Sequence, residues 1–108
     1  MKAWSPSETI TRLAPYAKAL IAAVLTGPAH TTASMRQSIC EGTPNDPRLL
    51  DYVDKVQNRS YRVAAKDIDA LHAAGFSDDA IFEITVAAAL GAALRRLQSG
   101  LRALGLER

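Results

Sequence analysis

A chain of 108 residues and 11.6 kDa fits one domain with a small core, so we expect a single domain over residues 1–108. Its residues are 48% hydrophobic but only 6% aromatic, which favours closely packed helices over a β-sandwich. Thirteen basic and eleven acidic side chains leave a formal charge of +2, far from the concentrated positive patch typical of nucleic-acid-binding proteins. The composition predicts an all-α protein without a nucleic-acid partner.

The N-terminal quarter is predicted to be mainly helical. Residues 1–6 read as a loose leader, and residues 7–27 as a helical region in which Pro15 lies near the start of the main apolar stretch. The predicted apolar side of this region consists of Leu20, Ile21, Val24 and Leu25. Gly27 and Pro28 end the helix, because glycine can leave the helical conformation and proline cannot extend it.

A second helix is predicted over residues 33–42. Thr31 or Thr32 can cap its start, and Gly42 ends it. Its apolar face consists of Met35, Ile39 and Cys40. Because Cys40 is the only cysteine, no intrachain disulfide and no Cys-x-x-Cys pair can form, which favours a cytoplasmic protein.

Two further helices are predicted in the middle of the chain. Asp46 is a good N-cap and Pro47 a good first residue for the third helix, whose apolar positions are Leu49, Leu50, Val53 and Val56. The fourth helix spans about residues 64–74 and stops at Gly75. Its inward positions are Ile68 and Leu71.

The last predicted helix is the longest. Ser77 caps it, Asp78 and Asp79 suit the positive end of the helix dipole, and no strong breaker follows before Leu104, so it would be about 40 Å long. A leucine seam follows it at spacings of four and three: Leu90, Leu94, Leu97, Leu101 and Leu104. The stretch "AAALGAA" surrounds the helix with small apolar side chains, which predicts cover by a second subunit and hence a homo-oligomer.

Export and membrane insertion are not predicted. Residues 17–30 have the apolar character of a signal peptide, but Glu8 and Pro15 precede them. The longest uninterrupted apolar run, Val86 to Leu94, has nine residues, about half of the roughly 20 that a membrane helix needs.

The segment "DIDALHAAGFSDDAIFEITVAAALGAALRRL", Asp67 to Leu97, resembles the core of the carboxymuconolactone decarboxylase and alkylhydroperoxidase-like superfamily. The resemblance implies a small all-helical protein that assembles into trimers, hexamers or related rings. Redox members carry Cys-x-x-Cys-x-x-x-His before the turn glycine, and the corresponding positions are Ser60, Val63 and Asp67. Without the two thiols the disulfide chemistry cannot run there, so the resemblance implies the fold and not the peroxidase activity. The decarboxylase branch needs no cysteine pair.

Acid and base groups would still be needed for a reaction of the decarboxylase type. The candidate catalytic residues are Asp67, Tyr61, Glu83 and His30, with His72 as a further base and Arg59 or Arg62 as a carboxylate clamp. Each has a structural alternative. His30 can be a solvated loop residue, Asp67 a first-turn acid, Tyr61 a packing residue and Glu83 an ion-pair partner that fixes packing. No cofactor or metal site is predicted.

Three functional hypotheses follow. The first is a small-molecule-binding protein or non-redox enzyme built as a homo-oligomer. The second is a catalytically inactive assembly or interaction module. The third is a peroxidase that acts through Cys40 alone, although that cysteine also suits the core.

Overall fold

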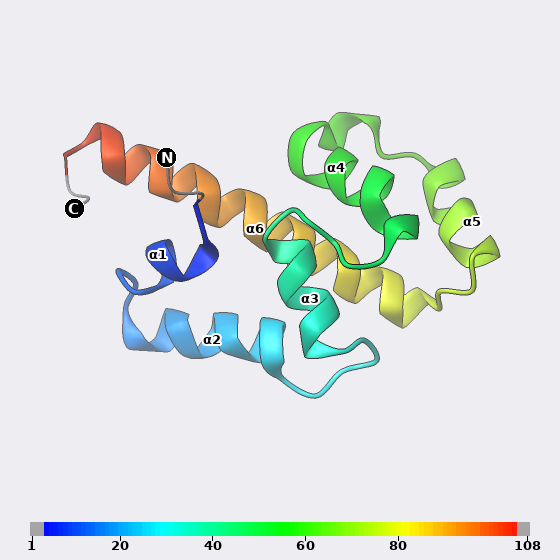
Figure 1. The fold of residues 1–108 in the computed structure, drawn as a ribbon, viewed down its shortest axis with the longest axis horizontal. Coiled ribbons are helices and arrows are strands. Elements are labelled where there is room, and N and C mark those ends of the chain that lie inside the picture. The colour runs from blue at the N-terminus through cyan, green and yellow to red at the C-terminus, as the bar shows by residue number, and fades with distance from the viewer. Residues whose placement is uncertain (1–3, 106–108) are drawn as a thin grey trace.

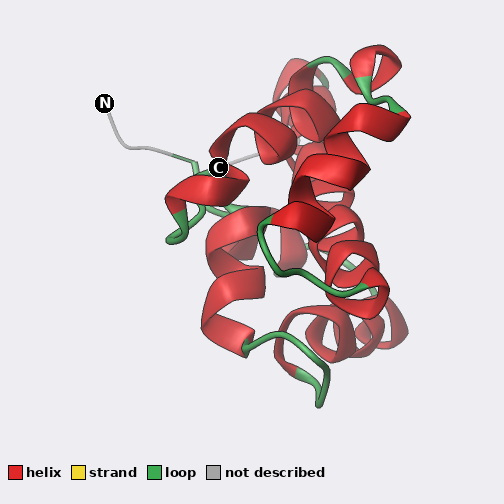
Figure 2. Ribbon diagram, turned by 90° about the vertical axis from the view of Figure 1, so that its right-hand side faces the viewer, coloured by secondary structure: helices red, strands yellow, loops and turns green. Residues whose placement is uncertain are grey.

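The structure, a computed structural model, describes residues 4–105, which form helices and no strand (Figures 1 and 2). The α-helices are α1 (Pro6–Ile10), α2 (Pro15–Thr26), α3 (Ala33–Cys40), α4 (Leu50–Asn58), α5 (Ala65–Ala73) and α6 (Asp78–Ala103); the 3-10 helices are η1 (Pro47–Leu49) and η2 (Ser60–Arg62). The predicted all-α class and the long C-terminal helix are confirmed.

The arrangement is organised around α6, which crosses most of a molecule measuring 45 × 29 × 23 Å (Figure 1). Helices α1, α3 and α4 pack along α6, while α2 packs mainly on α3 and α5 lies at the end where α6 begins. Within residues 4–105, no helix combines the length and apolar character needed to cross a membrane.

Three predicted helix ends are confirmed by hydrogen bonds and backbone angles. The Thr32 side chain accepts the Met35 N–H at 3.1 Å, and the Ser77 side chain accepts the Ala80 N–H at 3.1 Å. Gly75 ends α5 with φ +101°, a conformation that side chains other than glycine rarely adopt. Because these interactions are local, single residues in the sequence correctly predict these helix boundaries.

The core has two parts that lie on successive stretches of α6. One part joins α3, α4 and α5 to the first half of α6, and its largest buried members are Ile39, Leu49, Tyr52, Val53, Leu71, Ile81 and Ile84. The other part joins α2 and α3 to the second half, through Ile21, Leu25, Cys40 and Leu94. Gly91 lies between them, where a Cβ atom would collide with the Cys40 carbonyl, so its missing side chain permits α3 to approach α6.

Two predicted core positions are wrong. Leu20 and Leu50 have exposed side chains, 69% and 53% of their surface respectively. Helical spacing identified the helices correctly, but α2 and α4 are each covered over less of their circumference than their apolar residues occupy. The apolar residues at the edge of the covered face remain in solvent.

The expected loose leader, residues 1–6, is described only from Trp4 onwards, and that part is packed. Pro6 is buried at the start of α1, and the Trp4 Nε1–H donates to Thr9 Oγ1 at 3.2 Å. Thr9 in turn donates to Gln98 Oε1 at 2.9 Å, and the Arg95 guanidinium lies 5.0 Å from the Trp4 ring centroid. The N-terminal segment is thereby attached to the distal part of α6.

Candidate functional site

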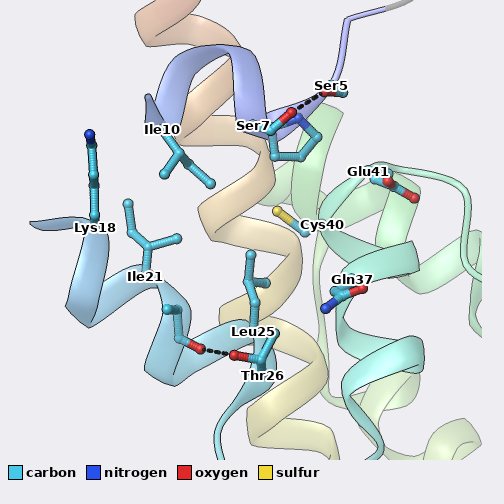
Figure 3. A pocket seen from close by; sticks show the side chains of 12 residues that line it. Ser5, Ser7, Ile10, Lys18, Ile21, Leu25, Thr26, Gln37, Cys40 and Glu41 are labelled. Atoms are coloured by element: carbon cyan, nitrogen blue, oxygen red, sulfur yellow. Dashed lines mark hydrogen bonds between the residues drawn. The ribbon is translucent and has the colours of Figure 1, made fainter. Parts of the chain in front are cut away.

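A cleft of about 240 Å³ lies between α1, α2 and α3 (Figure 3). Its apolar part is formed by Pro6, Ile10, Ile21, Ala22, Leu25 and Cys40. Its polar part is formed by Ser5, Ser7, Lys18, Thr26, Gln37 and Glu41. An apolar interior with a few polar groups at the edge is the usual composition of a small-molecule site.

The charged groups of the cleft stand on different helices. Lys18 comes from α2 and lies near Ile10, whereas Glu41 follows α3 on the other side (Figure 3). Lys18 lines the edge of the cleft and forms no ion pair with any residue that the structure describes. The arrangement can hold a small apolar molecule and attract an anionic group at one end.

Cys40 lies inside this cleft, and its thiol is a poor nucleophile. Burial, reinforced by the nearby negative charge of Glu41, raises the pKa of the Cys40 thiol to about 11. The thiol is therefore protonated near neutral pH, and it is the thiolate that attacks peroxides. This environment is that of a core cysteine.

Glu83 and His30 are the two predicted site residues that the structure brings together. The Glu83 carboxylate accepts the backbone N–H groups of His30 and Thr31 at 3.0 and 2.8 Å, and the Thr31 hydroxyl at 2.7 Å. The His30 Nδ1 lies 3.2 Å from the same carboxylate. Glu83 thus ties the α2–α3 loop to the beginning of α6.

The electrostatics of this carboxylate favour a structural role. Burial by itself would raise the pKa of Glu83, but the hydrogen bonds from His30 and Thr31 outweigh it and lower the pKa to about 2. Such a group stays ionised at neutral pH and is a weak base. His30 is 64% exposed and also lies 3.6 Å from Asp79.

A second, smaller cavity of about 170 Å³ lies beside this loop, between α2 and α6. It is lined by Ala23, Val24, Ala29, Arg36, Phe82, Glu83 and Val86. We call it the α2–α6 groove. The buried Arg36 guanidinium donates to the carbonyls of Val24 and Gly27 at 2.6 Å each, so it caps the end of α2.

Asp67 and Tyr61 do not join the other predicted site residues, and neither lines the cleft or the α2–α6 groove. Asp67 accepts Lys55 Nζ at 2.7 Å and the Ala64 N–H at 2.9 Å. The hydrogen bond from Lys55, followed by that from Ala64, lowers the pKa of the Asp67 carboxyl. Tyr61 lies in η2 with 82% of its surface exposed.

Sequence reasoning missed Lys18, Thr31 as a ligand of Glu83, and Arg36. Arg36 lies among the apolar positions Met35 and Ile39 of the same helix. A charged residue at such a position indicates a buried capping group. The remaining predicted base, His72, contacts Asp78 Oδ1 at 2.5 Å on the outer surface. Within residues 4–105, no three His, Cys, Asp or Glu side chains gather in a metal-binding arrangement.

Comparisons of the chain with protein-family models, with curated proteins and with solved structures find no match. The resemblance of Asp67–Leu97 to the carboxymuconolactone decarboxylase and alkylhydroperoxidase-like superfamily therefore stays a prediction.

Proposed function

We propose that this protein is a cytoplasmic, small-molecule-binding homo-oligomer, a divergent relative of the carboxymuconolactone decarboxylase and alkylhydroperoxidase-like superfamily without redox thiol chemistry. The observation that carries the binding role is the cleft between α1, α2 and α3, with its apolar interior and its Lys18 at the edge. Its ligand is a small apolar molecule with one anionic group. The buried Cys40 suits a reducing compartment.

Binding is favoured over turnover by the state of the acidic groups. Glu83 and Asp67 both accept several hydrogen bonds, and the pKa of each carboxyl is lowered. A general acid or base that works at neutral pH usually has a pKa near that value. A peroxidase reaction through Cys40 is disfavoured by the raised pKa of its thiol.

Benzoate is a suitable probe of the cleft, because it is a small ring with one carboxylate. In a titration followed by two-dimensional NMR, the largest shifts are expected at Ile21, Leu25 and their neighbours. Ala22→Trp, an exposed change at the wall of the cleft, should weaken binding at least about tenfold. Ala19→Trp on the same helix does not line the cleft and is the matched control.

Lys18→Met tests the contribution of the lysine charge to binding separately from that of the apolar cleft. The variant should weaken benzoate binding severalfold and leave the binding of neutral toluene unchanged. Shifts that are scattered over the surface, or equal effects of Ala22→Trp and Ala19→Trp, would contradict the proposed site.

The alternative, an assembly module without a ligand, is favoured by a different observation. Large apolar side chains stand in solvent on α2 and α6, with Leu20 and Phe82 each 69% exposed. Exposed apolar surfaces of this kind are commonly contact surfaces for another protein. Light scattering in dilute solution tests the oligomer directly, and a well-folded monomer would contradict it.

A further inference from the structure

An apolar strip runs along the solvent side of α6. Its members recur at helical spacing: Phe82, Val86, Ala89, Ala93, Leu97, Gly100 and Leu104. At about 100° per residue they fall within an arc of about 80°. Phe82 is 69% and Leu97 41% exposed, and Ala89 and Ala93 between them are exposed too. We call this surface the α6 strip.

The α6 strip lies opposite the side of α6 that the chain covers itself. The covered side carries Ala80, Ile84, Ala87, Gly91, Leu94 and Gln98, all buried. At about 100° per residue, the centre of this covered side lies about 140° around the helix from the centre of the strip. The α6 strip is therefore apolar on the side of the helix that the other described elements leave mostly exposed, apart from Val86 beside α2.

We propose that a second copy of this chain packs its α6 antiparallel against the α6 strip, about a two-fold axis level with Gly91. This inference deepens the oligomer in the proposed function and rests on that part of it. An isologous contact of this kind uses the same surface on both copies, so it needs a strip that is complementary to itself.

The direction follows from the charges of α6. All its acidic residues lie in the first six positions: Asp78, Asp79 and Glu83. Its basic residues lie in the last nine positions, and Arg96 borders the α6 strip, whereas Arg95 and Arg102 lie on the opposite side of the helix, Arg95 over the Trp4 ring. An antiparallel partner brings the acidic end of one helix to the basic end of the other, whereas a parallel partner would bring like charges together.

The register follows from the sizes of the side chains. With the axis level with Gly91, Phe82 faces Gly100 of the second copy, and Ala89 faces Ala93. A Cβ atom built at Gly100 meets nothing of its own chain within 4 Å, so there is space above it for the Phe82 ring. The two alanines permit the helix axes to approach closely at the centre.

The same register brings Leu97 of the second copy level with residue 85, beside the α2–α6 groove. This groove of about 170 Å³ is lined in part by Ala23, Phe82 and Val86 and has room for an aliphatic side chain. On an antiparallel pair, corresponding sides of the two strips face each other, so Leu97 meets the side on which α2 lies. Leu20 of α2, three positions from Ala23 and exposed, extends the apolar contact.

Cysteine cross-linking tests both the direction and the register. Two single variants, Ala89→Cys and Ala93→Cys, are prepared and oxidised separately and as a mixture. Both positions are exposed, so folding is retained, and the wild-type chain with its buried Cys40 is the blank. A disulfide needs Cα atoms about 6 Å apart. In the proposed pair residue 89 directly faces residue 93, whereas identical positions are offset by about 6 Å along the helices, so the mixture yields more mixed dimers than either variant alone yields of its own dimer.

Other outcomes would contradict the proposed pair. Cross-linking of each variant with itself that is more efficient than that of the mixture would overturn the antiparallel pair, because it indicates parallel helices. Cross-linking of Ser99→Cys, an exposed position off the strip, with the same yield would overturn it as random collision. No cross-link in an oligomer shown by light scattering would overturn this contact alone. A monomer by light scattering would overturn the proposed oligomer itself, while benzoate binding remains a separate result.

Discussion

The Nδ1 atom of His30 lies 3.2 Å from Oε2 of Glu83, although 53 positions separate the two residues in the chain. The backbone N–H of His30 donates to the same oxygen at 3.0 Å, and Thr31 occupies the other oxygen. One carboxylate on α6 thus anchors the whole loop between α2 and α3. The contact resembles an acid–base pair in composition, but its hydrogen bonds make it an anchor.

Glu83→Gln is expected to destabilise the protein by about 1–3 kcal/mol, because donors on His30 and Thr31 lose a charged acceptor. The free energy of unfolding is measured by urea denaturation. Glu41→Gln, which removes the same charge from an exposed residue, is the control and should have a much smaller effect. Equal effects would contradict the anchoring role.

The lowered pKa of Glu83 also predicts how the stability of the protein depends on pH. Its pKa is about 2 in the folded protein, against 4.5 for the ordinary carboxyl. A lowered pKa stabilises the fold above the ordinary value, and this contribution is lost as the pH falls from about 4.5 towards about 2. Urea denaturation between pH 6 and pH 2.5 should show a steeper loss for the wild-type chain than for Glu83→Gln. Parallel curves would show that this carboxyl does not carry the dependence.

Lys55→Met should lower the midpoint of thermal unfolding, because it leaves the Asp67 carboxylate without its ammonium partner. Methionine keeps most of the apolar stem of the lysine. The matched control is Lys66→Met, an exposed change on the neighbouring helix. Thermal unfolding followed by circular dichroism provides the comparison, and an unchanged midpoint for Lys55→Met would contradict the pairing.

The Cys40 thiol should react slowly with a disulfide reagent at pH 8, because it is buried and its pKa is raised to about 11. In guanidinium chloride, where the chain is unfolded, the same thiol should react at the rate of an ordinary cysteine. The release of the chromophore is followed by absorbance. Rapid reaction of the folded protein, or its consumption of hydrogen peroxide, would restore the peroxidase hypothesis.

The helices and their ends were predictable because they depend on local chemistry. Ser77 and Thr32 hold the first turns of α6 and α3 through hydrogen bonds to residues three positions away, and Gly75 ends α5 through its own backbone angle. Interactions of such short range can be recognised in the order of the residues. The long α6 was predictable for the same reason.

The candidate site was less predictable, because its residues meet only through packing. The spacing of residues along the chain contains no sign that Glu83 would reach His30, or that Lys18 and Glu41 would stand at one cleft. Asp67 and Tyr61 looked like site residues by their position before the turn at Gly75, yet Lys55 pairs with Asp67 and solvent surrounds Tyr61.

By itself, then, the amino-acid sequence determined the helical class, the helix ends and the apolar length of α6, since propensity, capping and periodicity act within a few residues. Only the tertiary structure decided which side of each helix is covered. Leu20 remained in solvent and Leu25 was buried on the same helix, because the neighbours of α2 cover one side of it and not the other. Contacts between distant segments depend on the angles at which helices pack, and those angles are set by the whole set of side chains together.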